Sequence, residues 1–403
     1  VTGPDIIFFW VARMIMAGYE FKGDIPFENV YFTSIIRDET GRKMSKSLGN
    51  SPDPLDLIAK YGADALRFGV MLIAPKGQDI LFSEDRLEVA RNFMNKVWNA
   101  SRFVLMNKDF DLTEDHLNPE KWSGLELADR WILHRLNVTI ERVTRQLDGF
   151  SFDETARSLW DFIWNDFCDW YIEMIKLRLY DGTPEQKQTA MSVAIYVLRD
   201  VMKMLHPYAP FMSEEIWQQV KLDDEKDLII TEWPVVREAF KAPEEAKNTD
   251  FLKKVITAVR TVRSEMNVPP SQSITLVGKV HTQAQLDILE QNAATIGKLT
   301  RSEDIKLGLN VEKPGFAASA MVEKMELFIP LEGIIDLEKE VERLEKEIAT
   351  TEGLLKSVQG KLANKNFVDR APEAIVNKEK DKLDHYGESL EKLKAHLETM
   401  KAL

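Results

Sequence analysis

Hydrophobic residues recur every three to four positions over the middle of the chain, which is the spacing of amphipathic helices that pack on a common core. Gly149, the turn Gly182–Pro184 and the pair His206-Pro207 interrupt this spacing. The pattern therefore predicts a helical bundle, with helices over residues 84–108, 127–148, 152–180, 185–206 and 210–220.

The segments on either side of this bundle follow a different pattern. Residues 1 to about 75 alternate helix, strand, loop and helix, and the apolar, β-branched run Val30–Ile36 predicts a buried strand. This order is typical of half of a doubly wound nucleotide-binding sheet. After the breaker Asn267–Ser271, short apolar strands alternate with one helix, Gln283–Ile296, which predicts a small α/β module.

The last part of the chain has a heptad pattern. Its apolar positions alternate steps of four and three over Leu337, Val341, Leu344, Ile348, Thr351, Leu355, Val358 and Leu362. The pattern returns from Leu383 to Met400 after a break at Asn364–Pro372. Two such helices either form an antiparallel hairpin or join two copies of the chain, and the short break favours the hairpin and hence a monomer.

The predicted fold class is therefore mixed α/β and α. We expect four domains: half of a Rossmann-like nucleotide-binding domain, a helical bundle, a small α/β linker module and a coiled-coil hairpin. Their ranges are 1–75, 76–268, 269–335 and 336–403.

The composition argues against a membrane protein, a disulfide-stabilised protein and a non-specific nucleic-acid binder. The chain has 403 residues, 44% of them hydrophobic and 30% charged, which is typical of a globular protein with long helices. No run of eighteen apolar residues occurs, so we expect no membrane partner. Cys168 is the single cysteine, so we expect no disulfide and no protein-bound zinc or other metal, which fits a reducing cytoplasm. The net charge of −13 argues against non-specific nucleic-acid binding, although local basic stripes can still bind one shaped RNA.

Candidate chemistry concentrates in Gly41–Asn50, which reads Gly-Arg-Lys-Met-Ser-Lys-Ser-Leu-Gly-Asn. Two lysines and two serines between glycines can bring several donors onto one polyphosphate. A solvated basic turn is the competing interpretation. The predicted strand before the loop and the helix that starts near Asp53-Pro54 favour a phosphate loop.

This loop resembles the KMSKS signature of class I aminoacyl-tRNA synthetases. Its flanks, with Tyr61–Asp64, are similar to the branch for valine, isoleucine and leucine, and the segments Val1–Met14 and Cys168–Met174 resemble its valyl members. The resemblance covers essentially the whole chain. None of the six histidines forms the family's His-x-Gly-His motif. We therefore expect a C-terminal portion of a longer enzyme, without that motif and without the inserted editing domain, and inactive alone.

The resemblance implies ATP-dependent activation of valine to valyl-adenylate and transfer to tRNA(Val), with Mg²⁺ arriving on the ATP. In this pattern Lys43 and Lys46 are catalytic, and Lys46 is the stronger candidate for direct phosphate contact. The ATP-binding candidates are Gly3, Asp5, Ser45, Lys46 and Ser47. Asp5 could instead only cap a helix ending at Gly18. Trp10 either packs in a core or forms a wall of the valine pocket.

The helix around residues 91–103 combines cations and aromatic residues, and Lys96, Arg102 and Phe103 are the candidates for contact with the anticodon loop of tRNA. Phe93 and Trp98 are expected in the core. Arg260 and Arg263 lie three positions apart and could meet backbone phosphate, but a solvated face is the favoured interpretation. The resemblance implies that residues 1–75 are the second half of the catalytic domain and that the helical domain contacts the tRNA stem and binds the anticodon. It also implies that the C-terminal hairpin is an arm for the tRNA elbow.

Two other functions stay open. A fragment of isoleucine–tRNA ligase is disfavoured by Cys168–Met174 and by the terminal hairpin. A non-catalytic tRNA-binding protein derived from a synthetase is disfavoured by Lys43 and Lys46, which a pure binder does not need.

Overall fold

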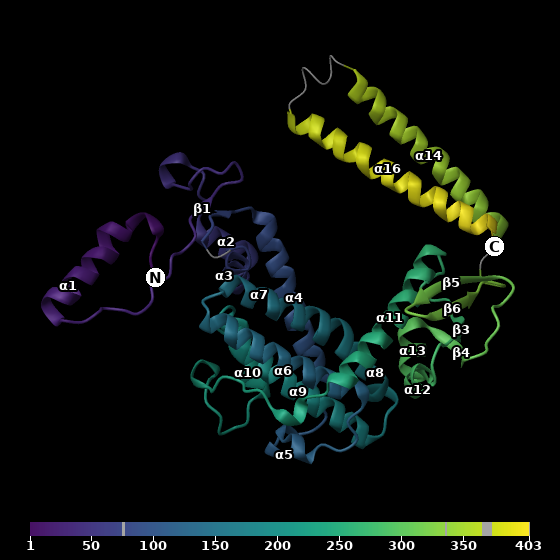
Figure 1. Ribbon diagram of the computed structural model, residues 1–403, viewed down its shortest axis with the longest axis horizontal. Helices are drawn as coiled ribbons and strands as arrows, with labels where there is room; N and C mark the ends of the chain where they lie inside the picture. The colour runs from purple at the N-terminus through teal and green to yellow at the C-terminus, as the bar shows by residue number, and fades with distance from the viewer. Residues whose placement is uncertain (75–76, 335–336, 365–372, 403) are drawn as a thin grey trace. The chain divides into compact units, whose positions relative to one another are not determined.

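The computed structural model describes residues 1–74, 77–334, 337–364 and 373–402 (Figure 1). They form two compact units, Val1–Thr249 and Asp250–Leu403. The predicted domain boundaries near 75 and 335 lie at or beside positions outside the described residues. The same holds for most of the predicted break Asn364–Pro372 and for the side chains of Leu337 and Met400 in the predicted heptads.

Most of the first unit is a helical bundle close to the predicted one. Its helices are α2 (Pro54–Tyr61), α3 (Ala63–Leu72), α4 (Glu84–Asn107), α5 (Glu114–Leu117), α6 (Leu127–Asp148), α7 (Phe152–Trp160), η5 (Asp161–Tyr171), α8 (Ile172–Asp181), α9 (Pro184–Leu205) and α10 (Pro210–Val220). Short 3-10 turns add η4 (Pro119–Lys121), η6 (Leu228–Ile230) and η7 (Glu238–Phe240), and α11 (Pro243–Glu265) continues into the second unit.

Helix α9 is the centre of this bundle. A capping box of Thr183 and Gln186 starts it, and between Thr189 and Leu205 every side chain except Lys203 is buried. A helix whose side chains are buried on every face is surrounded by other parts of the protein. The largest fully buried side chains of the bundle include Trp131, Trp217, Tyr171, Phe68 and Phe93.

The N-terminal part of the first unit contains little sheet. It has a 3-10 turn, η1 (Pro4–Ile6), a π-helical turn, η2 (Ile7–Val11), and helix α1 (Ala12–Lys22). Strand β1 (Ile36–Arg37) pairs in parallel with β2 (Ile80–Leu81). The prediction of a buried strand over Val30–Ile36 was wrong in extent. Phe32 forms an isolated bridge to Thr2 and only Ile36 lies in β1, although the backbone of Tyr31, Thr33 and Ile35 also bonds to Thr2 and Ile80. Val30 and Ile36 are exposed.

The second unit contains the predicted α/β module. A four-stranded sheet has the order β4-β3-β6-β5, built from β3 (Ile274–Lys279), β4 (Ser302–Gly308), β5 (Ala317–Val322) and β6 (Met325–Pro330). Strands β3 and β4 are parallel and are linked by α12 (Gln283–Gln291) and α13 (Ala293–Thr300), while β5 and β6 form an antiparallel hairpin. The single predicted helix is thus divided at Asn292.

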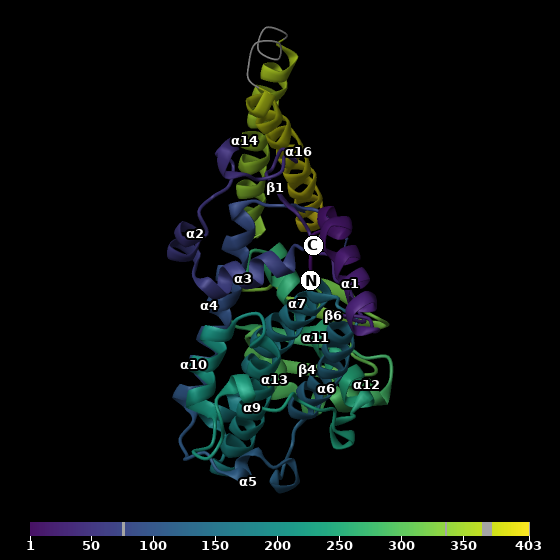
Figure 2. The same ribbon diagram turned by 90° about the vertical axis from the view of Figure 1, so that its left-hand side faces the viewer.

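Helices α14 (Leu337–Ala363) and α16 (Glu373–Ala402) lie side by side in both views (Figures 1 and 2). Their ion pairs set an antiparallel register: Lys401 with Glu345 at 2.7 Å, and Lys394 with Glu352 at 2.7 Å. Leu344, Ile348 and Val358 from the predicted heptad positions are buried along the contact. The two helices therefore pair within one chain.

Among the described residues, no helix combines the length and the apolar character that crossing a membrane requires.

Candidate functional site

The basic loop is built on a tight turn that follows β1. Gly41 and Gly49 have positive φ angles of 83° and 65°, a backbone conformation that favours glycine. Between them, Lys46–Leu48 form a 3-10 turn (η3), and the Ser45 hydroxyl accepts a hydrogen bond from the Leu48 backbone N–H at 3.3 Å. Ser45 and Ser47 are also hydrogen-bonded to each other, at 3.1 Å between their hydroxyl oxygens. The loop thus gathers its donors on a short, preformed turn.

Asp38 holds the start of this loop. Its carboxylate accepts hydrogen bonds from the Thr40 hydroxyl at 2.7 Å, the Asn50 amide at 2.8 Å and the Arg42 side chain at 3.0 Å. The bonds from Thr40 and then Asn50 keep the pKa of Asp38 well below its usual value. Asn50 in turn accepts from the Ser45 backbone N–H at 2.9 Å, so it ties both ends of the loop together. Sequence reasoning did not single out Asp38 or Asn50, although an Asx residue beside a glycine turn is a signal for such bonding.

The structure brings together two predicted groups that are far apart in sequence. Lys43 Nζ lies 3.3 Å from Asp5 Oδ2, and both side chains are about 60% exposed. Asp5 makes no side-chain capping bond to the helices that follow, and α1 runs past Gly18 to a left-handed cap at Gly23. The interpretation of Asp5 as a helix cap was therefore wrong. Gly3 precedes Asp5 and has open space where a Cβ would lie.

A mostly apolar hollow of about 400 Å³ lies beside the loop. Lys43, Met44 and Ser51 contribute to it, and its other walls come from β1, α2, α3 and the segment after β2. Sequence reasoning did not identify this hollow, because it depends on which faces of separate elements meet. The basic loop therefore lies beside an apolar surface.

Trp10 lies in η2 and is 57% exposed, so the interpretation of Trp10 as a core residue was wrong. It belongs to a run of exposed apolar side chains that includes Ile7, Phe8 and Phe9. An exposed apolar run of this kind marks a surface available for contact.

The predicted RNA-contacting residues all lie on α4. Lys96 pairs with Asp169 at 2.6 Å and lies over the Trp164 ring, 5.1 Å from its centroid. Phe103 is half-buried, with Lys176 over its ring at 5.5 Å, and Arg102 is exposed. Phe93 is buried as expected, whereas Trp98 is 45% exposed and was wrongly expected in the core. Lys96 and Phe103 are seven positions apart and share a face of α4, whereas Arg102 points to a different side.

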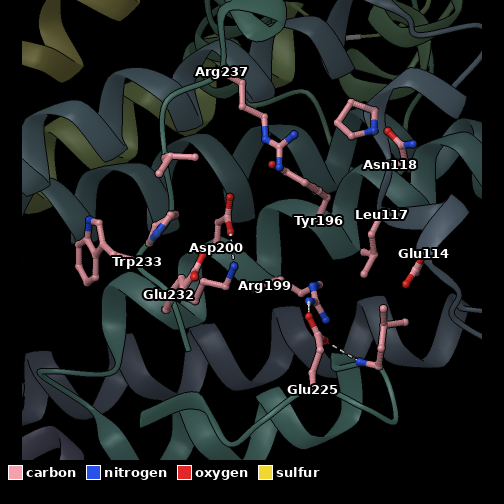
Figure 3. Close-up of a pocket in the computed structure, with 15 residues that line it drawn as sticks. Glu114, Leu117, Asn118, Tyr196, Arg199, Asp200, Glu225, Glu232, Trp233 and Arg237 are labelled. Atoms are coloured by element: carbon pink, nitrogen blue, oxygen red, sulfur yellow. Dashed lines mark hydrogen bonds and ion pairs between the residues drawn. The ribbon is translucent and has the colours of Figure 1, made fainter. Parts of the chain in front are cut away.

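A separate hollow of about 420 Å³ opens on the bundle beside α9 (Figure 3). Its bases and acids are largely matched: Arg199 pairs with Glu225, and Lys203 pairs with Asp200 at 3.2 Å. Glu114, Glu232 and Arg237 also line it. The hollow thus contains at least as many acidic as basic side chains. Both partners of each of these two ion pairs line the hollow.

Three family profiles match successive parts of the chain. Residues 1–83 match "tRNA synthetases class I (I, L, M and V)", residues 129–277 match "Anticodon-binding domain of tRNA ligase", and residues 336–401 match "Valyl tRNA synthetase tRNA binding arm". The basic loop thus lies in the class I synthetase match, the bundle from Asp129 onward lies in the anticodon-binding match, and the hairpin lies in the tRNA-binding-arm match.

Curated relatives agree with these matches. The chain is 45% identical to the valine–tRNA ligase of Enterococcus faecalis over 100% of its own length and 45% of the relative's length. It is 43% identical to the valine–tRNA ligase of Chlorobaculum tepidum over 99% of its length and 45% of the relative's length. The chain belongs to the valine–tRNA ligase family, and it spans about 45% of the length of these relatives.

Similar solved structures include LeuRS of Agrobacterium radiobacter in a ternary complex, at 21% identity and a TM-score of 0.46 over 60% of this chain and 29% of that one. Methionyl-tRNA synthetase of Mycobacterium tuberculosis matches at 19% identity and a TM-score of 0.41, over 53% of this chain and 41% of that one.

Proposed function

We propose that this chain works as part of a valine–tRNA ligase that activates valine with ATP and transfers the valyl group to tRNA(Val). The reaction has two steps: the valine carboxylate attacks the α-phosphate of ATP and releases pyrophosphate, and a terminal ribose hydroxyl of the tRNA then takes the valyl group. The observation that supports the proposal best is the loop Gly41–Asn50, with two lysines on a preformed turn in a chain of this family.

In the first step, negative charge moves onto the departing pyrophosphate, and a catalyst must place cations where that charge develops. Lys46 and Lys43 supply two ammonium groups on one short loop. The hydroxyls of Ser45 and Ser47 add donors beside them. Mg²⁺ would come with the ATP, as is usual where phosphates supply most of its ligands.

Asp5 and Gly3 would hold the ribose. A carboxylate can accept hydrogen bonds from both ribose hydroxyls, and a glycine lets a nucleotide approach the backbone closely. Asp5 already faces Lys43, so ribose and phosphates would bind next to each other. The exposed ring of Trp10 would form one wall of the valine pocket.

For tRNA, we propose contact through Lys96, Arg102 and Phe103 on α4 and through the hairpin of α14 and α16. We propose further that the protein acts in the cytoplasm, where its single cysteine would stay reduced. We also propose that it is a monomer, because the hairpin pairs its heptads within one chain.

A chimera tests this function. The matching part of the Enterococcus faecalis valine–tRNA ligase, 45% identical to this chain, is replaced by the chain, and ATP–pyrophosphate exchange is measured with valine and with isoleucine. Valine-dependent exchange and charging of tRNA(Val) are expected. Exchange that depends on isoleucine would favour the isoleucine–tRNA ligase alternative. Binding of tRNA(Val) without any exchange would favour a non-catalytic RNA-binding protein.

The chain alone provides a second test. Its six histidines include no His-x-Gly-His motif, so the purified chain is expected to form no valyl-adenylate. Detection of valyl-adenylate by the purified chain would show that the loop and its neighbours suffice for the first step.

A further inference from the structure

An arginine-lined hollow of about 470 Å³ lies within the second unit. It is formed by the end of α11, the turn Asn267–Pro270 and the end of α13. Ten residues line it, and three of them are arginines: Arg260, Arg263 and Arg301. None of the ten is acidic.

Two of these arginines are held in place by backbone carbonyls. Buried Arg263 donates hydrogen bonds to the carbonyls of Thr300 at 3.2 Å, Pro269 at 3.0 Å and Gln272 at 2.8 Å. The Nε of Arg260 donates to the carbonyl of Leu299 at 2.9 Å. The prediction of a solvated face was therefore wrong for Arg263 and right for the exposed Arg260. Guanidinium groups that are already ordered lose little conformational entropy when they bind a ligand.

The third arginine brings positive charge close to the first two. Arg301 is exposed, ends α13 and has a left-handed backbone, with φ at 55°. Burial, and after it the charge of Arg301, lower the pKa of Arg263 below its ordinary value. The hollow of Figure 3 differs, because four of its lining residues are acidic: Glu114, Asp200, Glu225 and Glu232. The arginine-lined hollow thus has the positive charge and the donors that an anion needs, and none of its ten lining residues is acidic.

We propose that this hollow binds a backbone phosphate of a structured RNA, an inference that rests on the proposed tRNA-binding function. Guanidinium groups match phosphate oxygens in geometry and charge. Arg260 and Arg301 are exposed, so the site is open to a large ligand. A phosphate that belongs to an RNA already held elsewhere on the chain reaches such an open site at high effective concentration, which a free anion does not.

The test measures how the affinity of the full chain for tRNA(Val) depends on salt, by filter-binding titrations between 50 and 200 mM. The wild type is compared with three variants. Arg301→Gln removes one cation, Arg301→Lys keeps it, and Lys313→Gln removes an exposed cation of the same unit that does not line the hollow. Arg263 is left intact because its carbonyl bonds hold the turn together.

Arg301→Gln is expected to reduce the steepness of log K against log salt by about 0.7–0.9, the contribution of one phosphate contact. Its affinity loss would then be about threefold larger at 50 mM than at 200 mM salt. Arg301→Lys is expected to keep the wild-type steepness and Lys313→Gln to leave it unchanged. Thermal melting of each variant checks that the fold is kept.

The possible failures are distinguishable. If the wild-type chain does not bind tRNA(Val), the proposed function and this inference both fall. If the wild type binds and Arg301→Gln keeps its steepness, or if Lys313→Gln changes it equally, only the inference about the hollow is overturned. Saturable binding of inorganic phosphate at millimolar concentration that Arg301→Gln abolishes would assign the hollow to a free anion and would also overturn the RNA assignment.

Discussion

Two ion pairs in this chain each join a basic side chain to an aspartate, but one is buried and the other is exposed. In the bundle, Arg178 donates two hydrogen bonds of 2.7 Å to Asp129, and Asp129 is fully buried. At the basic loop, Lys43 meets Asp5 at 3.3 Å with both side chains largely exposed. The comparison separates a pair that stabilises the fold from a pair whose members can exchange partners.

The buried pair is completed by a third group. The Tyr171 hydroxyl donates to Asp129 Oδ1 at 2.9 Å, and burial, followed by the charge of Asp129, raises the pKa of Tyr171 well above its usual value. Burial alone would lower the pKa of Arg178, but the hydrogen bonds and charge of Asp129 outweigh it, so the net pKa is raised. Each member is therefore needed to neutralise or satisfy the others.

The exposed pair is different because water competes for both groups. Such pairs typically contribute ~0–1 kcal/mol to stability. Lys43 can therefore leave Asp5 for a phosphate at little cost, which suits the nucleotide-binding role proposed for this loop.

The largest effect is expected from breaking the buried pair. Arg178→Met leaves Asp129 as an uncompensated buried charge and should lower the free energy of unfolding by ~3–5 kcal/mol. All nine tryptophans precede residue 234, so tryptophan fluorescence during denaturant unfolding follows the first unit alone.

The matched control is Lys43→Met, which breaks the exposed pair and should cost less than ~1 kcal/mol. Replacing both buried partners, Asp129→Leu with Arg178→Met, should recover only part of the loss. No unpaired buried charge remains between them, but Tyr171 and the Glu126 backbone N–H lose Asp129 as their acceptor. Equal destabilisation by Arg178→Met and Lys43→Met would refute the comparison.

At the basic loop, we expect a small effect on stability but a large effect on the rate of ATP–pyrophosphate exchange. In the chimera, Lys46→Ala should lower valine-dependent ATP–pyrophosphate exchange by ~10²–10³-fold, the scale of removing one donor to a transition state. The melting temperature should barely change, because the loop is exposed. Lys22→Ala, on the last turn of α1, is the control for loss of a surface cation. Near-normal exchange in Lys46→Ala would remove the loop from the mechanism.

The hairpin of α14 and α16 is also held by exposed ion pairs, Lys401 with Glu345 and Lys394 with Glu352. Deleting residues 337–403 should weaken tRNA(Val) binding by about tenfold at low salt, less at high salt, because backbone contacts depend on ionic strength. Exchange in the chimera should be kept. Sedimentation of the same deletion checks the alternative: a halved mass with unchanged tRNA affinity would mean that the hairpin joins two copies.

The smallest effect concerns pH. His206 is half-buried and bonded to the Ser213 hydroxyl at 2.8 Å, and burial lowers its pKa despite the nearby Glu214 and Asp64. A histidine whose pKa is lower in the folded state binds its proton more readily when unfolded, so its stabilising contribution is present above pH ~6.5 and is lost as the pH falls.

The wild type should therefore lose more stability than His206→Gln between pH 7.5 and 5.5. The difference in slope should stay below ~1.4 kcal/mol per pH unit, the limit for one proton. Thermal melts of both proteins at the two pH values measure it, and parallel curves would exclude a role for His206.

The amino-acid sequence by itself determined the helices and their breaks. Segments such as α6 and α10 begin and end where periodicity, glycine and proline predicted, because helix limits depend on residues within a few turns. The hairpin was equally readable, since its heptads repeat locally. The lysines and serines of the loop were identified because their chemistry is concentrated in ten consecutive residues.

Only the tertiary structure decided which distant side chains meet. Asp129 and Arg178 are 49 positions apart, and nothing in the sequence assigns one acid to one base over that distance. The same holds for Lys43 and Asp5, for the exposure of Trp10 and Trp98, and for the three arginines of the hollow. Burial and pairing depend on which faces pack together. Local pattern fixes the elements, but charge partners and exposed surfaces follow from long-range packing.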